Sequence, residues 1–190
     1  MNPFAQDIEN ALQVLQNGGI ILYPTDTVWG IGCDAANKKA IEAIHTLKKS
    51  KENKSMLILV SGEAMLDSYV QHIPDIAWEL LEAADNPLTI IYPGAKNLPG
   101  NLPDADNSIG IRITSDKFCK ALINRLKKPV VSTSANFFGE PNPGNFYEIH
   151  PDIIKNVDYV VKHRQYKNTP AKPSGIIKIG TNNEVKIIRH

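Results

Sequence analysis

The chain has 190 residues, 42% of them hydrophobic, which is enough for one domain with a sizeable core. Its 21 Lys and Arg residues are balanced by 20 Asp and Glu residues, so the net charge of +1 excludes a protein whose whole surface attracts nucleic acid, and any basic site must be local. The sequence shows neither a targeting leader nor an apolar run long enough for a membrane span, so we expect a single domain over residues 1–190, cytoplasmic and with no membrane partner.

The first part of the chain alternates helical and extended patterns. Residues 4–17 place apolar side chains at helical spacing and end at a Gly-Gly pair, which is a helix-ending signal. The apolar run that begins the predicted strand at 20–24 is typical of a strand covered on both faces. Asn37 can cap a second helix, and residues 56–60 predict another buried strand.

The same alternation continues to the C-terminus. Ser61, Pro74 and Ser115 open three further predicted helices, the last of which ends near Lys127. This pattern places the chain in the α/β class, with mixed strand pairing near the C-terminus. The strands predicted in this part span residues 88–92, 108–113, 129–134, 157–161, 175–179 and 185–189.

Polar side chains follow two of the predicted strands. Residues 23–34, YPTDTVWGIGCD, supply hydroxyls, one carboxylate and two glycines directly after an apolar strand. Residues 132–136, STSAN, do the same after Val130 and Val131. The carboxyl end of a strand in an open α/β sheet is where ligand crevices form, although ordinary turns and internally bonded hydroxyls use the same residue types.

A cluster of four lysines and one arginine have no evident anionic partner in the sequence. Lys48, Lys49, Lys51 and Lys54 lie within seven positions at the end of the second helix, as either a solvated helix end or a polyanion site. Arg112 interrupts an apolar strand, so it needs an anion, either an internal carboxylate or a bound one. Together with the hydroxyl clusters, these cations indicate an anion-binding site.

Familiar catalytic motifs are missing from the sequence. There is no Gly-x-x-x-x-Gly-Lys-Ser/Thr loop, Gly30-x-Gly32 lacks the third glycine of a dinucleotide fingerprint, and the five histidines form no triad or metal pattern. Cys33 and Cys119 are predicted to be buried free thiols in a reducing compartment. We therefore expect no catalytic side chain and no metal ligand from the protein, and a reaction that relies on positioning and charge neutralisation.

Five motifs in register resemble those of one known family. They are residues 23–34, the Lys-rich link before residues 56–59, Pro87-Leu88-Thr89, Ile111-Arg112 and residues 132–136. From about residue 10 to Arg189 the chain resembles the YrdC-like family of L-threonylcarbamoyladenylate synthases, in its single-domain form. The resemblance implies an α/β fold with a twisted, open, mixed β-sheet, flanking helices and a concave basic cavity.

The resemblance also implies an activity. Members of this family are nucleotidyltransferases that join L-threonine, bicarbonate and ATP, with Mg²⁺, into threonylcarbamoyl-AMP and pyrophosphate. The product supplies the threonylcarbamoyladenosine modification of tRNA, so tRNA or tRNA-modification enzymes are expected partners. No tightly bound cofactor is implied.

Site residues are carried over from the family by position. Arg112 suits a carboxylate because its donors form a fork. Asn136 is expected to brace the second hydroxyl cluster, and Asp26 to orient its own loop. The implied sets are Thr27, Arg112, Ser132 and Ser174 for threonine; Lys48, Ser50, Lys54, Ser108, Ser134, Asn142 and Arg189 for ATP; and Thr25, Asp26 and Asn136 in support.

The chain departs from the family pattern at two places. Ser50 stands where members usually carry Arg, which removes a bidentate phosphate donor that Lys49 or Lys51 could replace only as a point charge. The stretch at 162–164, Lys-His-Arg, stands where members often have Asp-Gly-Gly, so we expect this loop to run differently.

Two alternatives to a synthase remain open on the sequence. The first is an RNA-binding module that uses the concave basic face, although the near-neutral charge and the scarcity of aromatic residues beside the lysines disfavour it. The second is a non-catalytic YrdC-like paralogue that binds a nucleotide, which the loss of Arg at Ser50 would allow.

Overall fold

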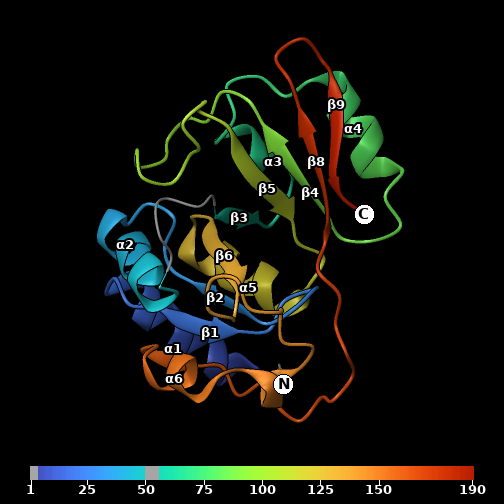
Figure 1. Cartoon of the computed structure of the whole chain (residues 1–190). Helices are drawn as coiled ribbons and strands as arrows, with labels where there is room; N and C mark the ends of the chain where they lie inside the picture. The colour runs from blue at the N-terminus through green and yellow to red at the C-terminus, as the bar shows by residue number, and fades with distance from the viewer. Residues whose placement is uncertain (1–3, 50–55) are drawn as a thin grey trace.

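The structure, a computed structural model, describes residues 4–49 and 56–190, and in these residues nine strands form one mixed sheet in the order β7-β1-β2-β6-β3-β5-β4-β8-β9. Figure 1 shows the open, twisted sheet with helices around it, so the predicted α/β fold is confirmed. The strands are β1 (Ile21–Tyr23), β2 (Gly30–Gly32), β3 (Leu57–Val60), β4 (Leu88–Tyr92), β5 (Ile109–Ile113), β6 (Val130–Ser134), β7 (Tyr159–Val160), β8 (Gly175–Ile179) and β9 (Val185–Arg189).

Helices flank the sheet at the predicted places, with two short additions. Asn37 caps the second helix as predicted, because its side chain accepts a hydrogen bond from the backbone N–H of Ala40 at 3.1 Å. Two other helices begin after Gly62 and Asp116 rather than after Ser61 and Ser115. The helices are α1 (Ala5–Gln16), α2 (Lys38–Leu47), α3 (Glu63–Asp67), α4 (Asp75–Glu82), α5 (Lys117–Leu126), α6 (Pro151–Lys155) and the 3₁₀-helix η1 (Phe146–Glu148), of which α6 and η1 were not predicted.

The strand β2 corrects the sequence prediction, in which its residues belonged to a loop. Its Gly-Ile-Gly sequence has little strand propensity, but it pairs antiparallel with β1 on one side and with β6 on the other. Tyr23 lies opposite Gly30 in the first ladder, and Gly30 lies opposite Ser134 in the second. Residues 24–29 therefore form the loop of a β1–β2 hairpin, and β6 pairs with β2 on its other side. Mixed pairing also runs through the whole sheet and not only near the C-terminus.

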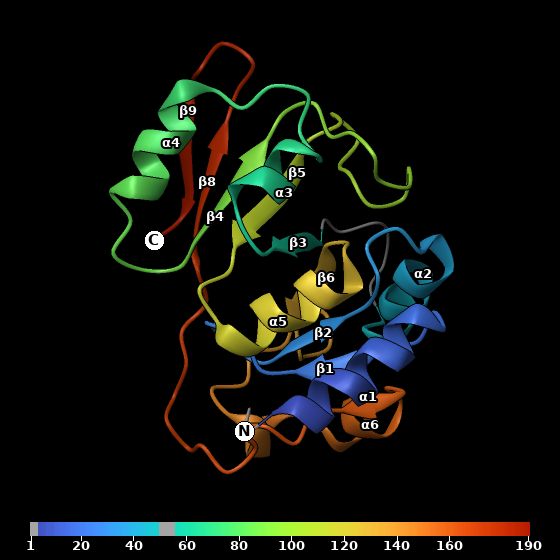
Figure 2. The ribbon, with the colours of Figure 1, turned by 180° about the vertical axis from the view of Figure 1, so that it is seen from behind.

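Apolar side chains form two clusters around the sheet. One contains the buried faces of α1 and α5, which pack against each other and against residues of β1, β3 and β6. Figure 2 shows these two helices side by side in front of the sheet. The other cluster joins α2, α3, α4 and α6 to the sheet. Each fully buried Leu, Ile or Phe side chain contributes about 1.5–3 kcal/mol, so these clusters fix the sheet that carries the polar residues.

Two sequence expectations about the chain as a whole can be compared with the structure. Cys33 and Cys119 are buried and free, as predicted, and burial raises the pKa of both thiols, so neither is a ready nucleophile. No helix in the described residues is long and apolar enough to cross a membrane.

Close backbone approach at Gly32 should make it intolerant of any side chain. A Cβ there would lie 2.4 Å from the Val131 carbonyl oxygen, which belongs to the sheet and cannot turn away. We expect Gly32→Ala to lower the free energy of unfolding by about 2–4 kcal/mol in urea denaturation. Gly100→Ala is the control, since a Cβ there meets nothing within 4 Å. Equal effects of the two substitutions would contradict the described packing of β2 against β6.

Candidate functional site

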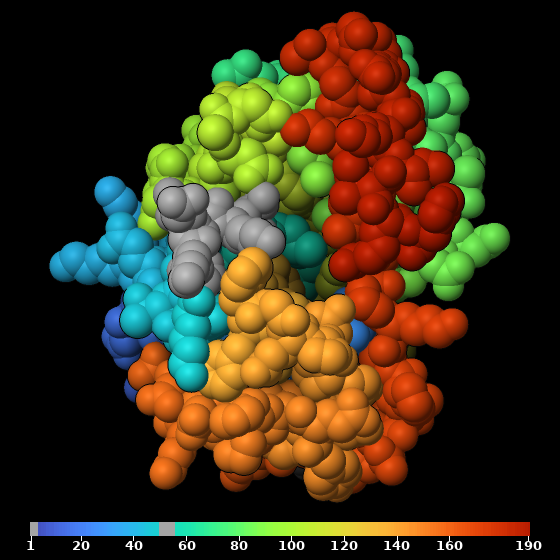
Figure 3. All heavy atoms as spheres, in the orientation of Figure 1, coloured from blue at the N-terminus to red at the C-terminus, as the bar shows by residue number. Residues whose placement is uncertain are grey.

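A cavity of about 340 Å³, lined by both polar and apolar side chains, lies on the sheet between β4, β5, β6, β8, β9 and the β1–β2 connection. Figure 3 shows the hollow between the red β8–β9 hairpin, the orange segment that follows β6 and the lime-coloured loop before β5. Because successive side chains of a strand point to opposite faces, the lining positions recur at every second residue. They are Thr89 and Ile91 on β4, Gly110 and Arg112 on β5, Ser132 and Ser134 on β6, and Ser174 and Ile176 at and within β8.

Arg112 is the buried cation of this cavity. The side chains of Arg112 and Asp26 are 4% and 6% exposed, and Arg112 Nη2 lies 3.1 Å from Asp26 Oδ1. The same nitrogen donates to Thr27 Oγ1 at 3.1 Å, whereas Arg112 Nε is buried without a hydrogen-bond partner among the described residues. An unsatisfied buried donor costs about 1–3 kcal/mol, and Arg112 lines the cavity, so an anion bound there would meet a guanidinium whose hydrogen bonds are incomplete.

Asp26 joins the connection after β1 to the end of β5. Its Oδ2 atom accepts hydrogen bonds from Thr114 Oγ1 at 3.2 Å and from the backbone N–H of Ser115 at 3.1 Å. The Asp26 carboxylate therefore serves as the internal counter-ion that Arg112 needs, and its hydrogen bonds tie its own loop to the end of β5. Thr25 shapes this loop from within, because its hydroxyl donates to the Val28 carbonyl at 2.9 Å and accepts from the Thr27 N–H at 3.0 Å.

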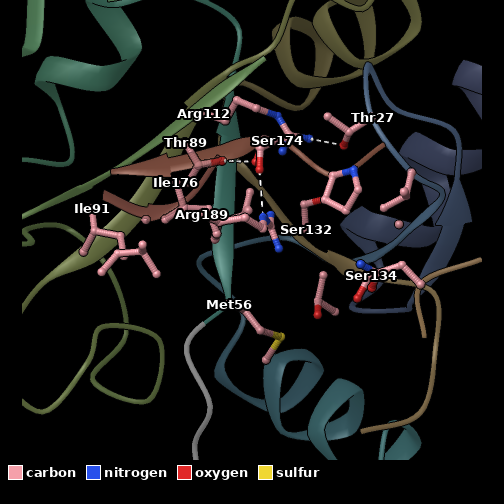
Figure 4. A pocket seen from close by; sticks show the side chains of 18 of the residues that line it. Thr27, Met56, Thr89, Ile91, Arg112, Ser132, Ser134, Ser174, Ile176 and Arg189 are labelled. Carbon is pink, nitrogen blue, oxygen red and sulfur yellow. Dashed lines mark hydrogen bonds between the residues drawn. The ribbon is translucent and has the colours of Figure 1, made fainter. Parts of the chain in front are cut away.

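Three groups lie near Arg112 in the cavity (Figure 4): the hydroxyl of Thr89 on β4, the hydroxyl of Ser174 just before β8, and the guanidinium of Arg189 on β9. Ser174 Oγ lies 2.8 Å from Thr89 Oγ1, and both residues are buried. Arg189 Nε donates to the Ser174 carbonyl at 2.9 Å. Burial and the nearby Arg112 lower the pKa of Arg189, and the repulsion between these two cations falls when an anion binds between them.

The two described lysines of the predicted cluster, Lys48 and Lys49, both contact the protein itself. Lys48 Nζ donates to the backbone carbonyls of Ser134 and Asn136 at 2.5 and 2.6 Å, and burial lowers the pKa of Lys48 to about 8. Lys48 thereby fixes the end of β6 from outside the cavity. The amine of Lys49 lies 4.3 Å from the centre of the Phe137 ring. The predicted positions Ser50, Lys51 and Lys54 lie outside the described residues.

The remaining predicted residues fall both inside and outside the cavity. Lining it are Thr27, Arg112, Ser132, Ser134, Asn142, Ser174 and Arg189. Ser108 does not line it, because its buried hydroxyl donates to Asp106 Oδ1 at 2.5 Å. The Asn136 side chain donates to the Phe137 and Glu140 carbonyls at 3.1 and 2.7 Å, so it braces the following loop rather than the hydroxyl cluster.

Several lining residues were not predicted. Thr89 belonged to a recognised motif but had no assigned role, and Asp104 carries the one carboxylate among the described lining residues. Side chains alternate between the two faces of a strand, so this alternation along β4 and β8 would have indicated Thr89 and Ile176 once the strand order β5-β4-β8 was known. The apolar wall consists of Val28, Trp29, Met56, Leu57, Ile91, Ile176 and Ile188.

Comparisons with known proteins agree on one family. The family model described as "Sua5_yciO_yrdC: Telomere recombination" matches residues 13–190. A threonylcarbamoyl-AMP synthase of Pseudoalteromonas translucida is 32% identical over 172 residues, covering 89% of this chain and 91% of the relative. E. coli YciO superposes with a TM-score of 0.85 at 26% identity, covering 100% of this chain and 91% of that chain.

A more distant structural neighbour shares the fold. P. abyssi Sua5, solved in complex with L-threonine, superposes with a TM-score of 0.79 at 21% identity, covering 90% of this chain. This chain spans 50% of the length of that protein.

The lowered pKa of Lys48 makes stability depend on pH. Between about 8 and the ordinary value of 10.5, the unfolded chain binds a proton that the folded chain has lost, so stability rises with pH. We expect the free energy of unfolding of the wild type, relative to that of Lys48→Met, to be flat below about pH 7 and to rise between about pH 8 and 10.5. Chemical denaturation at fixed pH values measures this difference, and a flat or falling profile above pH 8 would contradict the burial of the amine.

Proposed function

The chain belongs to the Sua5/YciO/YrdC family, and we propose that it is an L-threonylcarbamoyladenylate synthase. It joins L-threonine, bicarbonate and ATP into threonylcarbamoyl-AMP and pyrophosphate for the threonylcarbamoyladenosine modification of tRNA, and it works in the cytoplasm. The observation that supports this most directly is Arg112, a buried guanidinium that pairs with Asp26 and lines the cavity.

Threonine binds at the end of the cavity where Arg112 and Ser174 lie. The guanidinium of Arg112 takes the carboxylate, because a charged forked donor binds it more strongly than a neutral group does. Thr27 orients Arg112, and the hydroxyls of Ser132, Ser174 and Thr89 offer partners to the amine and hydroxyl of the amino acid. Curated relatives that match most of this chain carry the name threonylcarbamoyl-AMP synthase, which favours this assignment over other carboxylate ligands.

The reaction requires the reactants to be aligned, and it does not require a nucleophilic side chain of the protein. Bicarbonate takes up a proton and loses water to give carbon dioxide; the neutral threonine amine attacks its carbon, and the nitrogen then loses a proton, which gives a carbamate. A carbamate oxygen then attacks the α-phosphorus of ATP, and pyrophosphate leaves. Arg112 and Arg189 neutralise the anions that meet in this step, while Ser134 and Asn142 extend the cavity toward the nucleotide. Lys48 supports the end of β6, and Ser50 and Lys54 remain predicted nucleotide contacts.

Mg²⁺ fits the cavity as an ion that arrives with ATP. Proteins usually bind Mg²⁺ through one or two carboxylates together with substrate phosphates, and Asp104 supplies one carboxylate among the described lining residues. When bound, Mg²⁺ neutralises charge on the phosphates. Asp104 is the residue that would hold it.

A non-catalytic paralogue that binds RNA or a nucleotide is the second candidate. Ser50, which replaces a phosphate-binding Arg of the family, favours it. The carboxylate of Asp104 and the balanced overall charge disfavour an RNA cradle at this cavity.

Pyrophosphate release from Mg²⁺-ATP tests the proposal. We expect release to require both L-threonine and bicarbonate, and Arg112→Ala to lower kcat/KM for threonine about 100-fold, because a charge-assisted bond to the carboxylate is lost. The matched control is Arg125→Ala, which removes an exposed arginine paired with Glu9 and should keep wild-type rates.

Loss of folding in Arg112→Ala would mimic this result, since Asp26 would be left as an uncompensated buried charge. Arg112→Ala combined with Asp26→Asn removes that charge and should be equally inactive with threonine. Release that is independent of threonine, or unchanged in both Arg112 variants, would reject the synthase. Nucleotide binding without any release would favour the paralogue.

A further inference from the structure

The segment from 162 to 173, here called the strap, links the two halves of the sheet. It follows β7, which pairs with β1. Ser174 then joins it to β8, which pairs with β4. Figure 1 shows it as the orange-red trace that runs along one side of the molecule. The strap begins with the stretch Lys162-His163-Arg164.

Arg164, near the start of the strap, contacts the loop that carries Thr27. Its Nη1 atom donates to the Thr25 carbonyl oxygen at 3.2 Å, and its Nη2 atom forms an ion pair with Asp116. The side chains of Arg164 and Asp116 are 18% and 10% exposed, so solvent screens this pair only partly. The backbone of Arg164 has φ of +67°, a left-handed conformation that is uncommon for residues other than glycine.

From Asp116 the contacts return to Arg112. The backbone N–H of Asp116 donates to Thr114 Oγ1 at 3.2 Å, and Thr114 Oγ1 donates to Asp26 Oδ2 at 3.2 Å. Asp26 in turn pairs with Arg112. The network therefore joins the connection between β5 and α5 to the buried cation.

The network closes on itself through Thr27. Arg112 donates to Thr27 Oγ1, Thr27 Oγ1 lies 3.1 Å from Thr25 Oγ1, and the Thr25 carbonyl accepts from Arg164. Residues 25–27 are thus held from both sides, by Arg112 on the cavity side and by Arg164 on the strap side.

The rest of the strap packs along the same loop. A small cavity of about 70 Å³ between them is lined by Thr25, Thr27 and Trp29 on one side and by Lys167 and Ala171 on the other. The Ala171 N–H donates to the Gly144 carbonyl at 2.9 Å, which fixes the strap two residues before Pro173 and Ser174 at the main cavity.

We infer that Arg164 is a positioning residue for threonine binding: its bond to the Thr25 carbonyl holds residues 25–27 so that Thr27 and Asp26 orient Arg112 toward the carboxylate. The inference rests on the proposed function. Its ligand is the same amino acid, and Arg164 acts on it only through Thr25, Thr27 and Asp26. ATP binding, which uses the other part of the cavity, should not depend on Arg164.

A purely structural role for Arg164 would be to neutralise Asp116. Asp116 caps α5, because its Oδ1 atom accepts from the Cys119 N–H at 2.9 Å. Loss of Arg164 alone would leave this carboxylate poorly compensated and could unfold the chain. Asp116→Asn keeps an acceptor for the cap and removes the charge, so it separates the two roles.

The experiment compares Asp116→Asn with the double variant Asp116→Asn/Arg164→Met. The two proteins differ by the Arg164 side chain and have no Asp116 charge to leave unpaired. We expect equal thermal stability within a few degrees, an unchanged KM for ATP, and a KM and calorimetric Kd for L-threonine about tenfold higher in the double variant, equivalent to about 1.4 kcal/mol. Lys172→Met, which removes an exposed cation of the strap, should match the wild type.

Arg164→Lys in the Asp116→Asn background refines the test. A lysine has one ammonium that can reach the Thr25 carbonyl, so we expect it to recover part of the threonine affinity. Equal threonine affinity in Asp116→Asn and in the double variant would overturn the inference, as would an equal loss of affinity for threonine and ATP. Failure of the wild type to bind threonine at all would instead reject the proposed function.

Discussion

The buried positive charge of Arg112, on β5, constrains the arrangement of the whole site. An isolated guanidinium in the interior would cost several kcal/mol, so Arg112 requires a carboxylate close by. Asp26 supplies it from another part of the chain, and this contact draws the connection after β1 onto the end of β5. The pair leaves Arg112 Nε without a hydrogen-bond partner among the described residues, and the Arg112 side chain lines the cavity. We therefore expect stability to require the ion pair, and ligand binding to use the part of the guanidinium that the cavity exposes.

The sheet provides the space for this ion pair and its ligand. Residues of β4, β5, β6 and β8 line the cavity, and two glycines, Gly110 on β5 and Gly30 on β2, keep it open. A Cβ on Gly30 would lie 3.1 Å from Ser132 Oγ, and one on Gly110 would lie 3.3 Å from Leu57 Cβ. The strap then ties the loop before Gly30 to Ser174, which directly precedes β8. Residues that are distant in sequence meet because mixed pairing places β2, β6, β3 and β5 side by side.

The sequence predicts the parts of this structure that depend on local pattern. Helical spacing and the Asn37 cap identify α2, and apolar runs identify β1 and β6. By contrast, β2 is a strand because it pairs with β1 on one side and with β6, about 100 residues away in the chain, on the other, and its own propensity does not reveal this. Ser108 was expected at the nucleotide, but the nearer Asp106 carboxylate binds its hydroxyl. Arg164 could not be assigned from sequence, because its partners Thr25 and Asp116 come from two other segments.

The central claim is that Arg112, held by Asp26 and Thr27, binds the carboxylate of an amino acid. Calorimetric titration of the wild-type protein with L-threonine and with L-threoninol, in which a hydroxymethyl group replaces the carboxylate, tests it most directly. The account predicts that L-threonine binds and that L-threoninol binds about 100-fold more weakly or not at all, because the charge-assisted bond is absent. Equal affinity for the two compounds would contradict it.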